Sequence, residues 1–248
     1  MKDKIIKILV ILFMTICFIG IIYYSYKVLS WKHDLKENKI IHEEINKFVI
    51  VEEETKADYE EKKYNINFKS LKEKNSDTIA YLKVNNTKIN HIVVKGKDNS
   101  YYLHHNFNKE WSSAGWVFAD FHNKFDGTDK NIVIYGHSML NGSMFGTLRN
   151  VLKKEWYENK NNHLITLVTE NGEYTYQVFS TYVIMAEDYY INTNFKNSSE
   201  FKKFVNTIKS RSKHNFNVSV NENDEILTLS SCYDNNGKRV VLHAKKVK

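Results

Sequence analysis

The most prominent pattern in the chain is an uninterrupted apolar run at residues 8–24, which follows a head that contains several lysines. With flanking apolar residues, this run reaches the length that a helix needs to cross a bilayer. It ends in Tyr23, Tyr24 and Tyr26, which is typical of a membrane interface, whereas a cleaved signal peptide would end at a small-residue site. We therefore expect residues 1–30 to form an uncleaved membrane anchor, with the rest of the chain on one side of the membrane.

The segment after the anchor is charged, and residues 31–63 contain no glycine. Ile40, Ile41 and Ile45 fall at roughly helical spacing, which predicts one or two amphipathic helices. A further short helix is expected near residues 67–74. The prediction is thus a helical extension over residues 31–75, which either acts as a spacer or packs on the main domain.

From residue 76 onward, short apolar runs alternate with Gly, Asn and Asp turn signals, as expected for β-strands. Two helices interrupt them, at about residues 143–154 and 198–212. Many short strands with few helices predict a mainly β fold with a closed or nearly closed barrel. The expected strands are residues 79–84, 88–94, 115–119, 131–135, 163–169 and 173–185, and a final pair on either side of Cys232.

Charge and composition narrow the function. The chain has 248 residues, 42% of them hydrophobic, which indicates a folded protein with an ample core. Four of its seven net positive charges come from residues 1–32, so the remainder is close to neutral. There is no dense basic patch with interleaved aromatic residues, and nucleic-acid binding is therefore not expected.

Three side chains are candidates for chemistry. Cys232 is the only cysteine outside the apolar run, and it lies where one strand of the final pair ends. Arg239, one of three arginines among 36 basic residues, lies where the other strand begins, so a hairpin would place the two side by side. His137 follows another buried strand that ends in Gly136. A thiol, an imidazole and a guanidinium together could carry out nucleophilic catalysis, although each residue alone could be inert.

These residues occur in a pattern that resembles a known family. Thr228-Leu229-Ser230-Ser231-Cys232 is similar to the Thr-Leu-x-Thr-Cys motif of sortases, with Ser231 where threonine is usual. The position of Arg239 resembles that of the family's essential arginine, and the segment 131–139 resembles its strand and catalytic histidine. Segments 80–84 and 98–107 are most similar to class B sortases. The resemblance covers nearly all of residues 76–248.

The resemblance implies a closed eight-stranded sortase-type β-barrel with N-terminal helices and a helix inserted before the last strands. It also implies a transpeptidase on the outer face of a Gram-positive cell membrane, held by a single membrane-spanning segment. The implied partners are secreted proteins that carry a C-terminal sorting motif and an amine of the peptidoglycan precursor. The catalytic domain would then comprise residues 76–248.

The same resemblance implies the roles of individual residues. Cys232 would be the nucleophile, His137 the general acid and base, and Arg239 the group that stabilises the oxyanion or orients the substrate. It implies no cofactor and no metal. The residues expected to line the groove for the sorting motif are Asn99, Leu103, Tyr135, Tyr189, Ile191 and Ser230.

Two other readings of the sequence are open. A cysteine protease or other acyl-hydrolase could use the same Cys232 and His137 with water as the acceptor. Papain-like enzymes, however, place the cysteine before the histidine, and here the histidine comes first. The second reading is a non-catalytic, membrane-tethered β-domain in which Cys232 is merely buried.

Overall fold

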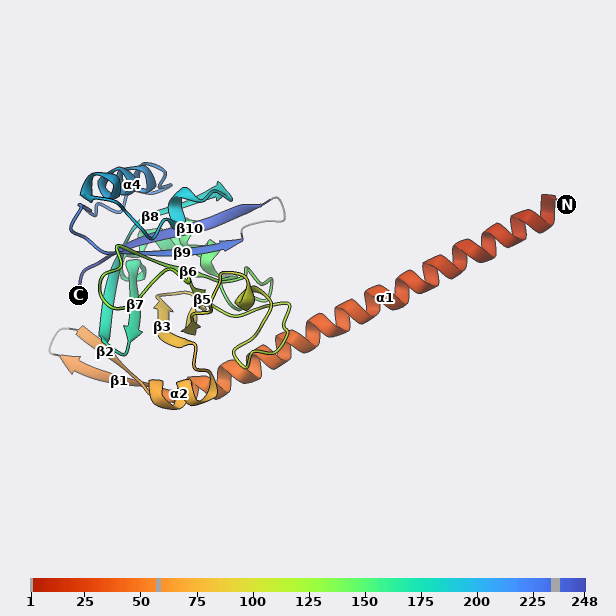
Figure 1. Cartoon of the computed structure of the whole chain (residues 1–248), viewed down its shortest axis with the longest axis horizontal. Coiled ribbons are helices and arrows are strands. Elements are labelled where there is room, and N and C mark those ends of the chain that lie inside the picture. The colour runs from red at the N-terminus through yellow and green to blue at the C-terminus, as the bar shows by residue number, and fades with distance from the viewer. Residues whose placement is uncertain (1, 57–58, 233–236) are drawn as a thin grey trace.

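A long helix and a compact barrel make up the molecule (Figure 1). The computed structural model describes residues 2–56, 59–232 and 237–248; the side chains of Lys2, of residues 53–62 and of Cys232 lie outside that description. Helix α1 (Lys2–Ile45) continues without a break from the apolar run into the charged segment. At about 1.5 Å per residue it is roughly 65 Å long. Its N-terminal part projects far from the barrel and is not buried by any other part of the described chain.

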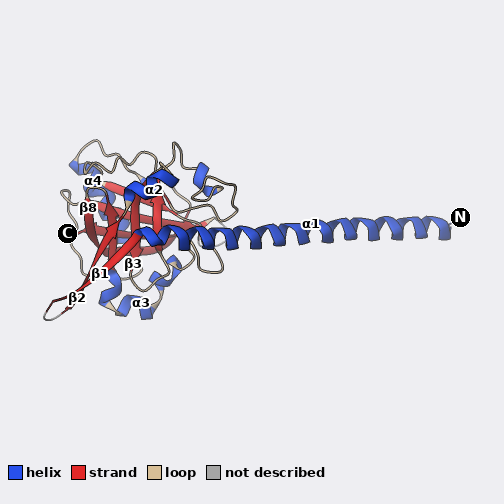
Figure 2. Cartoon of the chain, turned by 90° about the horizontal axis from the view of Figure 1, so that it is seen from below, coloured by secondary structure: helices blue, strands red, loops and turns tan. Residues whose placement is uncertain are grey.

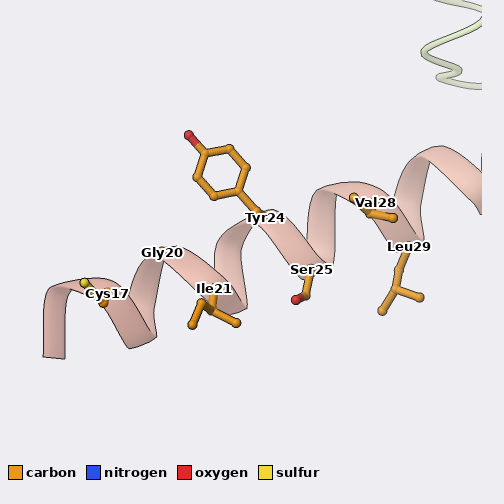
Figure 3. Close-up of a pocket in the computed structure, with 7 residues that line it drawn as sticks. All are labelled: Cys17, Gly20, Ile21, Tyr24, Ser25, Val28 and Leu29. Carbon is orange, nitrogen blue, oxygen red and sulfur yellow. The ribbon is translucent and has the colours of Figure 1, made fainter. Parts of the chain in front are cut away.

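The apolar part of α1 is long enough to cross a membrane and is a candidate anchor. Figure 3 shows seven residues on this part of the helix, including Cys17, Gly20 and Tyr24, and the barrel covers none of them. A Cβ atom added at Gly20 would meet no atom within 4 Å. These apolar side chains thus have no protein surface to pack against, as expected for a segment that is surrounded by lipid.

Eight of the ten described strands close into a barrel in the order β10-β8-β7-β3-β4-β5-β6-β9. Figure 2 shows the strands in red, with the shorter helices around them and α1 extending away. The pairs β4–β5 and β6–β9 are parallel, and the other neighbouring pairs are antiparallel. This confirms the closed eight-stranded barrel. The barrel strands are β3 (Thr78–Val84), β4 (Asn90–Val94), β5 (Phe118–Ala119), β6 (Asn131–Tyr135), β7 (Leu164–Thr169), β8 (Gly172–Met185), β9 (Ile226–Cys232) and β10 (Lys238–Lys246).

The barrel interior is filled with large apolar side chains, and helix α4 (Ser198–Ser210) covers a second, smaller core outside it. Asn197 caps α4, because its side-chain oxygen accepts a hydrogen bond from the Glu200 N–H at 2.9 Å. The helix buries the apolar positions that its sequence pattern indicates, and each contributes about 1.5–3 kcal/mol. These positions are Phe201, Phe204, Val205 and Ile208. The helix predicted before the last strands is therefore confirmed.

The extension over residues 31–75 is only partly helical. After α1 and the 3₁₀ turn η1 (Asn46–Phe48), strands β1 (Val49–Lys56) and β2 (Tyr59–Ile66) form an antiparallel hairpin, and helix α2 (Phe68–Lys74) follows. The expectation of a second amphipathic helix was wrong here. The β-branched run Val49-Ile50-Val51 favours a strand, and the register pairs Glu52 with Lys63, of opposite charge.

The predicted helix at residues 143–154 was also wrong in most of its length. The chain makes turns up to the 3₁₀ helix η3 (Leu148–Leu152) and then the short helix α3 (Lys154–Glu158). Gly142 and Met144 have φ angles of +81° and +50°, which an α-helix does not allow. The other short 3₁₀ turns are η2 (Tyr101–Leu103), η4 (Lys160–His163) and η5 (Tyr189–Ile191).

The C-terminal part of α1 packs on the barrel and does not act as a detached spacer. Ile41 and Ile45 are buried at 4% and 1% exposure. The buried Asn38 donates from Nδ2 to Ser112 Oγ at 2.9 Å, and Ser113 Oγ donates to Asp34 Oδ2 at 2.7 Å. Polar and apolar contacts together therefore fix the helix against the loop that precedes β5.

Candidate active site

Two neighbouring parallel strands deliver the predicted catalytic residues to one rim of the barrel. Tyr135, the last residue of β6, pairs with Ser230 of β9. His137 and Cys232 each follow two residues after this pair, on adjacent strands. On the other side of β9, the register pairs Cys232 with Arg239 of β10. The backbone therefore brings the three predicted positions together, as expected from the sequence, while the Cys232 side chain itself lies outside the description.

A cavity of about 250 Å³ opens at this rim. Seven of the nine predicted site residues line it: Asn99, Leu103, Tyr135, His137, Ile191, Ser230 and Arg239. Three further residues that we had not predicted also line it, namely Phe118, Gly136 and Ser231.

His137 is half-buried, and a hydrogen bond defines its tautomer. Its Nε2 lies 2.8 Å from the carbonyl oxygen of Leu103. A carbonyl oxygen can only accept, so Nε2 carries the proton, and Nδ1 is the nitrogen that gains and loses a proton in a reaction. The backbone supports this placement, because Phe145 N–H donates to the His137 carbonyl oxygen at 2.9 Å. A Cβ atom at Gly136 would come within 2.7 Å of the Phe145 ring, so this position requires glycine.

Arg239 is half-buried and turns back onto its own hairpin. Its Nη1 donates to the carbonyl oxygens of Gly237 and Lys238 at 3.3 and 3.2 Å. Within the described residues, no carboxylate forms an ion pair with it. The guanidinium lines the cavity, where its positive charge can attract a developing negative charge.

Asp120 is a functional candidate that sequence reasoning missed. It is 3% exposed and follows directly after β5. Its carboxylate accepts hydrogen bonds from Asn99 Nδ2 at 2.7 Å and from the Tyr135 hydroxyl at 2.8 Å. Burial, and then the charge of Asp120, raise the pKa of Tyr135 well above its usual value. The only available signal was an acidic residue at the end of a predicted strand, on the same rim as the other site residues.

Of the predicted groove residues Ser230 and Tyr189, only Ser230 lines the cavity. The Ser230 hydroxyl lines the cavity and lies 3.1 Å from the hydroxyl of the buried Tyr190. Tyr189, in contrast, does not line this cavity: its hydroxyl donates to Tyr182 at 3.3 Å, and the Arg211 guanidinium lies 4.7 Å from its ring centre. Ile191, two residues further along the same 3₁₀ turn, does line the cavity.

The geometry suits acyl transfer. The His137 imidazole and the Arg239 guanidinium flank the strand end that carries the thiol, beside a cavity of about 250 Å³. In the part of the chain that the structure describes, no group of three or more histidine, cysteine or carboxylate side chains is arranged to hold a metal ion.

Comparison with known proteins identifies this arrangement. Residues 82–247 match the sortase domain. A curated relative, sortase B of Staphylococcus aureus (strain NCTC 8325 / PS 47), is 35% identical over 184 residues, which cover 73% of this chain and 75% of the relative. A solved structure of B. anthracis sortase B in complex with AAEK1 has 30% identity and a TM-score of 0.76, and the match covers 87% of this chain and 99% of that chain. The Clostridium perfringens sortase B structure has 38% identity and a TM-score of 0.69, over 73% of this chain and 100% of that chain.

The chain belongs to the sortase family, whose members are cysteine transpeptidases. Within that family it is a class B sortase, since its relatives and its solved structural neighbours are sortase B proteins.

Proposed function

We propose that Cys232, His137 and Arg239 carry out the transpeptidation. One observation supports this most directly: the register of β6, β9 and β10 brings the three positions to the rim of one cavity. Cys232 attacks the backbone carbonyl carbon of the sorting motif, and the carbonyl electrons move onto oxygen. Arg239 stabilises that oxyanion with its guanidinium.

His137 moves the protons in both half-reactions. As the C–N bond of the tetrahedral intermediate breaks, the protonated imidazole gives its Nδ1 proton to the leaving amine, and a thioacyl-enzyme forms. The incoming amine then attacks the thioester carbon, and the neutral imidazole takes a proton from it. Expulsion of the Cys232 thiolate leaves a new amide bond, so that the enzyme returns to its starting state.

The substrates are proposed by analogy with similar solved structures. Similar solved structures include a Staphylococcus aureus sortase B–substrate complex, with 35% identity and a TM-score of 0.68, and a sortase B complexed with triglycine, with 35% identity and a TM-score of 0.69. By analogy, this chain acts on secreted proteins with a C-terminal sorting motif and transfers them to an amine of the peptidoglycan precursor. Asn99, Leu103, Tyr135, Ile191 and Ser230 are proposed to hold the motif.

The location follows from α1. The candidate anchor would cross the cell membrane once, with the barrel on the outer side, where both secreted proteins and the cell-wall precursor are present. The continuous helix would hold the barrel close to the bilayer surface.

Product analysis tests the reaction. Full-length protein in maltoside micelles is incubated with sorting-motif peptides, with and without a glycine-peptide amine. We expect the transfer product to dominate when the amine is present and to vanish in Cys232→Ala. Hydrolysis that exceeds transfer at a saturating amine concentration would favour the acyl-hydrolase reading, and activity that persists in Cys232→Ala would exclude both enzymatic readings.

The role of Arg239 has its own test. Loss of one oxyanion donor typically lowers kcat by about 10²–10³-fold. We expect a loss of about this size in Arg239→Met, and a smaller loss in Arg239→Lys, which keeps the charge but not the planar fork. Single-turnover acylation rates measure this directly. Equal losses in both variants would show that the charge alone contributes nothing.

A further inference from the structure

A second cavity, of about 270 Å³, lies between α1 and the loop that follows His137. It is separate from the active-site cavity and shares no lining residue with it. Helix α1 provides one wall, the start of β4 a second, and the loop a third. The lining residues are Leu35, Asn38, Lys39, His42, Lys88, His91, Asn141, Gly142, Ser143 and Met144.

Buried polar atoms in this cavity have no hydrogen-bond partner among the described residues. They are Asn38 Oδ1, His42 Nδ1 and the ring nitrogens of His91, whose nearest backbone hydrogen-bonding group is that of Met144, outside ordinary hydrogen-bond geometry. Asn38 and His91 are each 4% exposed. Such groups are costly to bury without a partner, by about 1–3 kcal/mol each, and native proteins pair almost all of them. The cavity is therefore built to place polar atoms against something that hydrogen-bonds with them.

The charges around the cavity indicate what kind of ligand could hydrogen-bond with these polar atoms. Each ionisable residue in the lining is basic, namely Lys39, His42, Lys88 and His91, and no carboxylate is among them. Asn46 Nδ2 lies 2.9 Å from His42 Nε2, and when this amide nitrogen donates to Nε2 the His42 proton is on Nδ1, at the unpartnered atom. Ammonium groups and an imidazole N–H are donors that match the oxygens of an anion.

We propose that this cavity is a binding site for a small oxyanion, a carboxylate or phosphate group, held by Lys39, Lys88 and the imidazoles of His42 and His91. The His42 and His91 rings lie 4.8 Å apart between centroids, so one anion can contact both. If His91 takes up a proton together with the anion, both of its ring nitrogens become donors, and one of them can donate to the anion.

Such binding has a defined effect on protonation. Burial lowers the pKa of His42, although Glu43 opposes this. Burial, and then the charge of His42, lower the pKa of His91 to about 3. The backbone group of Met144 opposes this more weakly. The charged groups around the pair are Lys39, Lys88 and Lys83, and Glu43, which is the partner of Lys39 at 3.6 Å. A bound anion favours the charged imidazolium, so the pKa of both histidines should rise when it binds.

The site can influence catalysis through the loop that it shares with His137. Asn141, Gly142, Ser143 and Met144 form the wall of the cavity, and the next residue, Phe145, donates its N–H to the His137 carbonyl oxygen. Met144 has a φ angle of +50°, an unfavourable conformation for a side chain of this size. An occupant that fixes this loop would therefore also fix the position of His137.

Histidine NMR tests the site in the full chain, in maltoside micelles that contain no phosphate. We expect inorganic phosphate, at ionic strength held constant with chloride, to shift the His42 and His91 imidazole ¹⁵N resonances saturably and to raise both pKa values. His42→Gln and His91→Gln assign the signals. Lys88→Gln should raise the apparent Kd about fivefold or more, since it removes one charge at close range. The matched control is Lys202→Gln, an exposed charge on α4, which should leave Kd unchanged.

The source of the anion is resolved in nanodiscs without free phosphate. A shift of the same two resonances in phosphatidylglycerol, but not in phosphatidylcholine, identifies an anionic lipid headgroup as the source. A response only to added phosphate identifies a soluble anion. The proposal is overturned if neither resonance responds to any of these probes, or if Lys88→Gln and Lys202→Gln weaken the response equally, which would mean an adventitious ion only. Binding is measured without any peptide substrate, so the result is independent of the proposed transpeptidation.

Discussion

Asp120 connects the substrate wall of the active site to the barrel. Its Oδ2 accepts from Asn99 and Tyr135, while its Oδ1 accepts from the backbone N–H of His122 at 3.0 Å and lies 2.8 Å from His122 Nδ1. A single buried carboxylate thus fixes two side chains that line the cavity, one from a loop and one from the end of β6. We infer that Asp120 is a positioning residue, because it acts on the substrate through Asn99 and Tyr135.

Replacement of Asp120 should therefore affect binding more than chemistry. In Asp120→Asn, the charge that holds Asn99 and Tyr135 is lost, and charge-assisted hydrogen bonds of this kind contribute about 1.5–3 kcal/mol each. We expect the KM for a sorting-motif peptide to rise about tenfold or more, with a change in kcat of less than about threefold. Asp126→Asn, in an exposed turn, is the control and should change neither constant. A fall in kcat at constant KM would contradict a positioning role.

Single residues differ in how well the sequence reveals them. The positions of Cys232, His137 and Arg239 at one rim could be predicted, because each lies just before or after a strong apolar strand or at its end; their catalytic roles rest on the resemblance and remain a proposal. Asp120 and Ser231 could not be predicted, since an acidic residue or a serine at a strand end is usually solvated. Tyr189 was expected to line the groove, but its hydroxyl points to Tyr182 instead. Only the three-dimensional contacts distinguish these cases.

At the scale of elements, a buried chain of hydrogen bonds links the strands beneath the site. Thr228 Oγ1 donates to Asn131 Oδ1 at 2.6 Å and therefore accepts from His243 Nδ1 at 2.8 Å. The other nitrogen, His243 Nε2, accepts from the Tyr182 hydroxyl at 2.8 Å. β6, β9, β10 and β8 are thus joined through a neutral imidazole that is fully satisfied. Burial lowers the pKa of His243 to about 3.

This network predicts how stability depends on pH. In the unfolded chain His243 takes up a proton near pH 6.5, but in the folded chain only near pH 3, so stability is retained above 6.5 and decreases as the pH falls below it. Between the two pKa values, His243 lowers the free energy of unfolding by about 1.4 kcal/mol for each unit by which the pH falls. His91 makes a similar contribution in the absence of an anion. Urea unfolding of His243→Gln between pH 7 and 5 should give a shallower slope, and the exposed His104→Gln the wild-type slope. An unchanged slope in His243→Gln would contradict the assignment of a neutral, buried imidazole.

The loop between β6 and η3 depends on one close contact. Because a Cβ at Gly136 would lie 2.7 Å from the Phe145 ring, Gly136→Ala should displace Phe145 and, with it, His137. We expect a loss of kcat/KM of at least about tenfold. The double variant Gly136→Ala/Phe145→Leu should recover part of this activity, because the smaller side chain makes room. Gly20→Ala, where no atom lies within 4 Å, is the control. Without any recovery in the double variant, the contact with Phe145 would not explain the loss.

Helices and strands could be predicted where the spacing of apolar residues follows a single period, either that of a helix or that of a strand. Strand β6 begins and ends at the residues expected, and α4 buries the four apolar side chains expected of it. The hairpin β1–β2 was missed because its charged residues, read alone, fit a helix as well as a strand; cross-strand pairing decides. The helix at 143–154 was wrong because the spacing of apolar residues does not reveal that Met144 adopts a φ angle of +50°, which a helix does not allow.

At the scale of the whole molecule, α1 connects the candidate anchor to the barrel without a hinge. The same helix that carries the apolar run also forms the hydrogen bonds of Asp34 and Asn38 with the barrel, and Glu44 pairs with Lys74 of α2 at 2.6 Å. The orientation of the barrel relative to the helix is therefore fixed by these contacts. The anion cavity lies at this junction, on the face of α1 that meets the His137 loop.

Cysteine accessibility tests this arrangement, because Cys17 is exposed in the isolated chain and has no covalent partner. In Cys232→Ala, reconstituted in lipid vesicles, we expect a charged thiol reagent to leave Cys17 unlabelled until the protein is denatured, since lipid surrounds residue 17. In Cys17→Ser/Cys232→Ala/His33→Cys, the thiol is placed beyond the apolar run and should react at once. On intact protoplasts, labelling of position 33 by an impermeant reagent would place the barrel outside. Rapid labelling of Cys17 in sealed vesicles would instead mean that this part of α1 does not lie in the membrane, and the proposed location of the enzyme would be wrong.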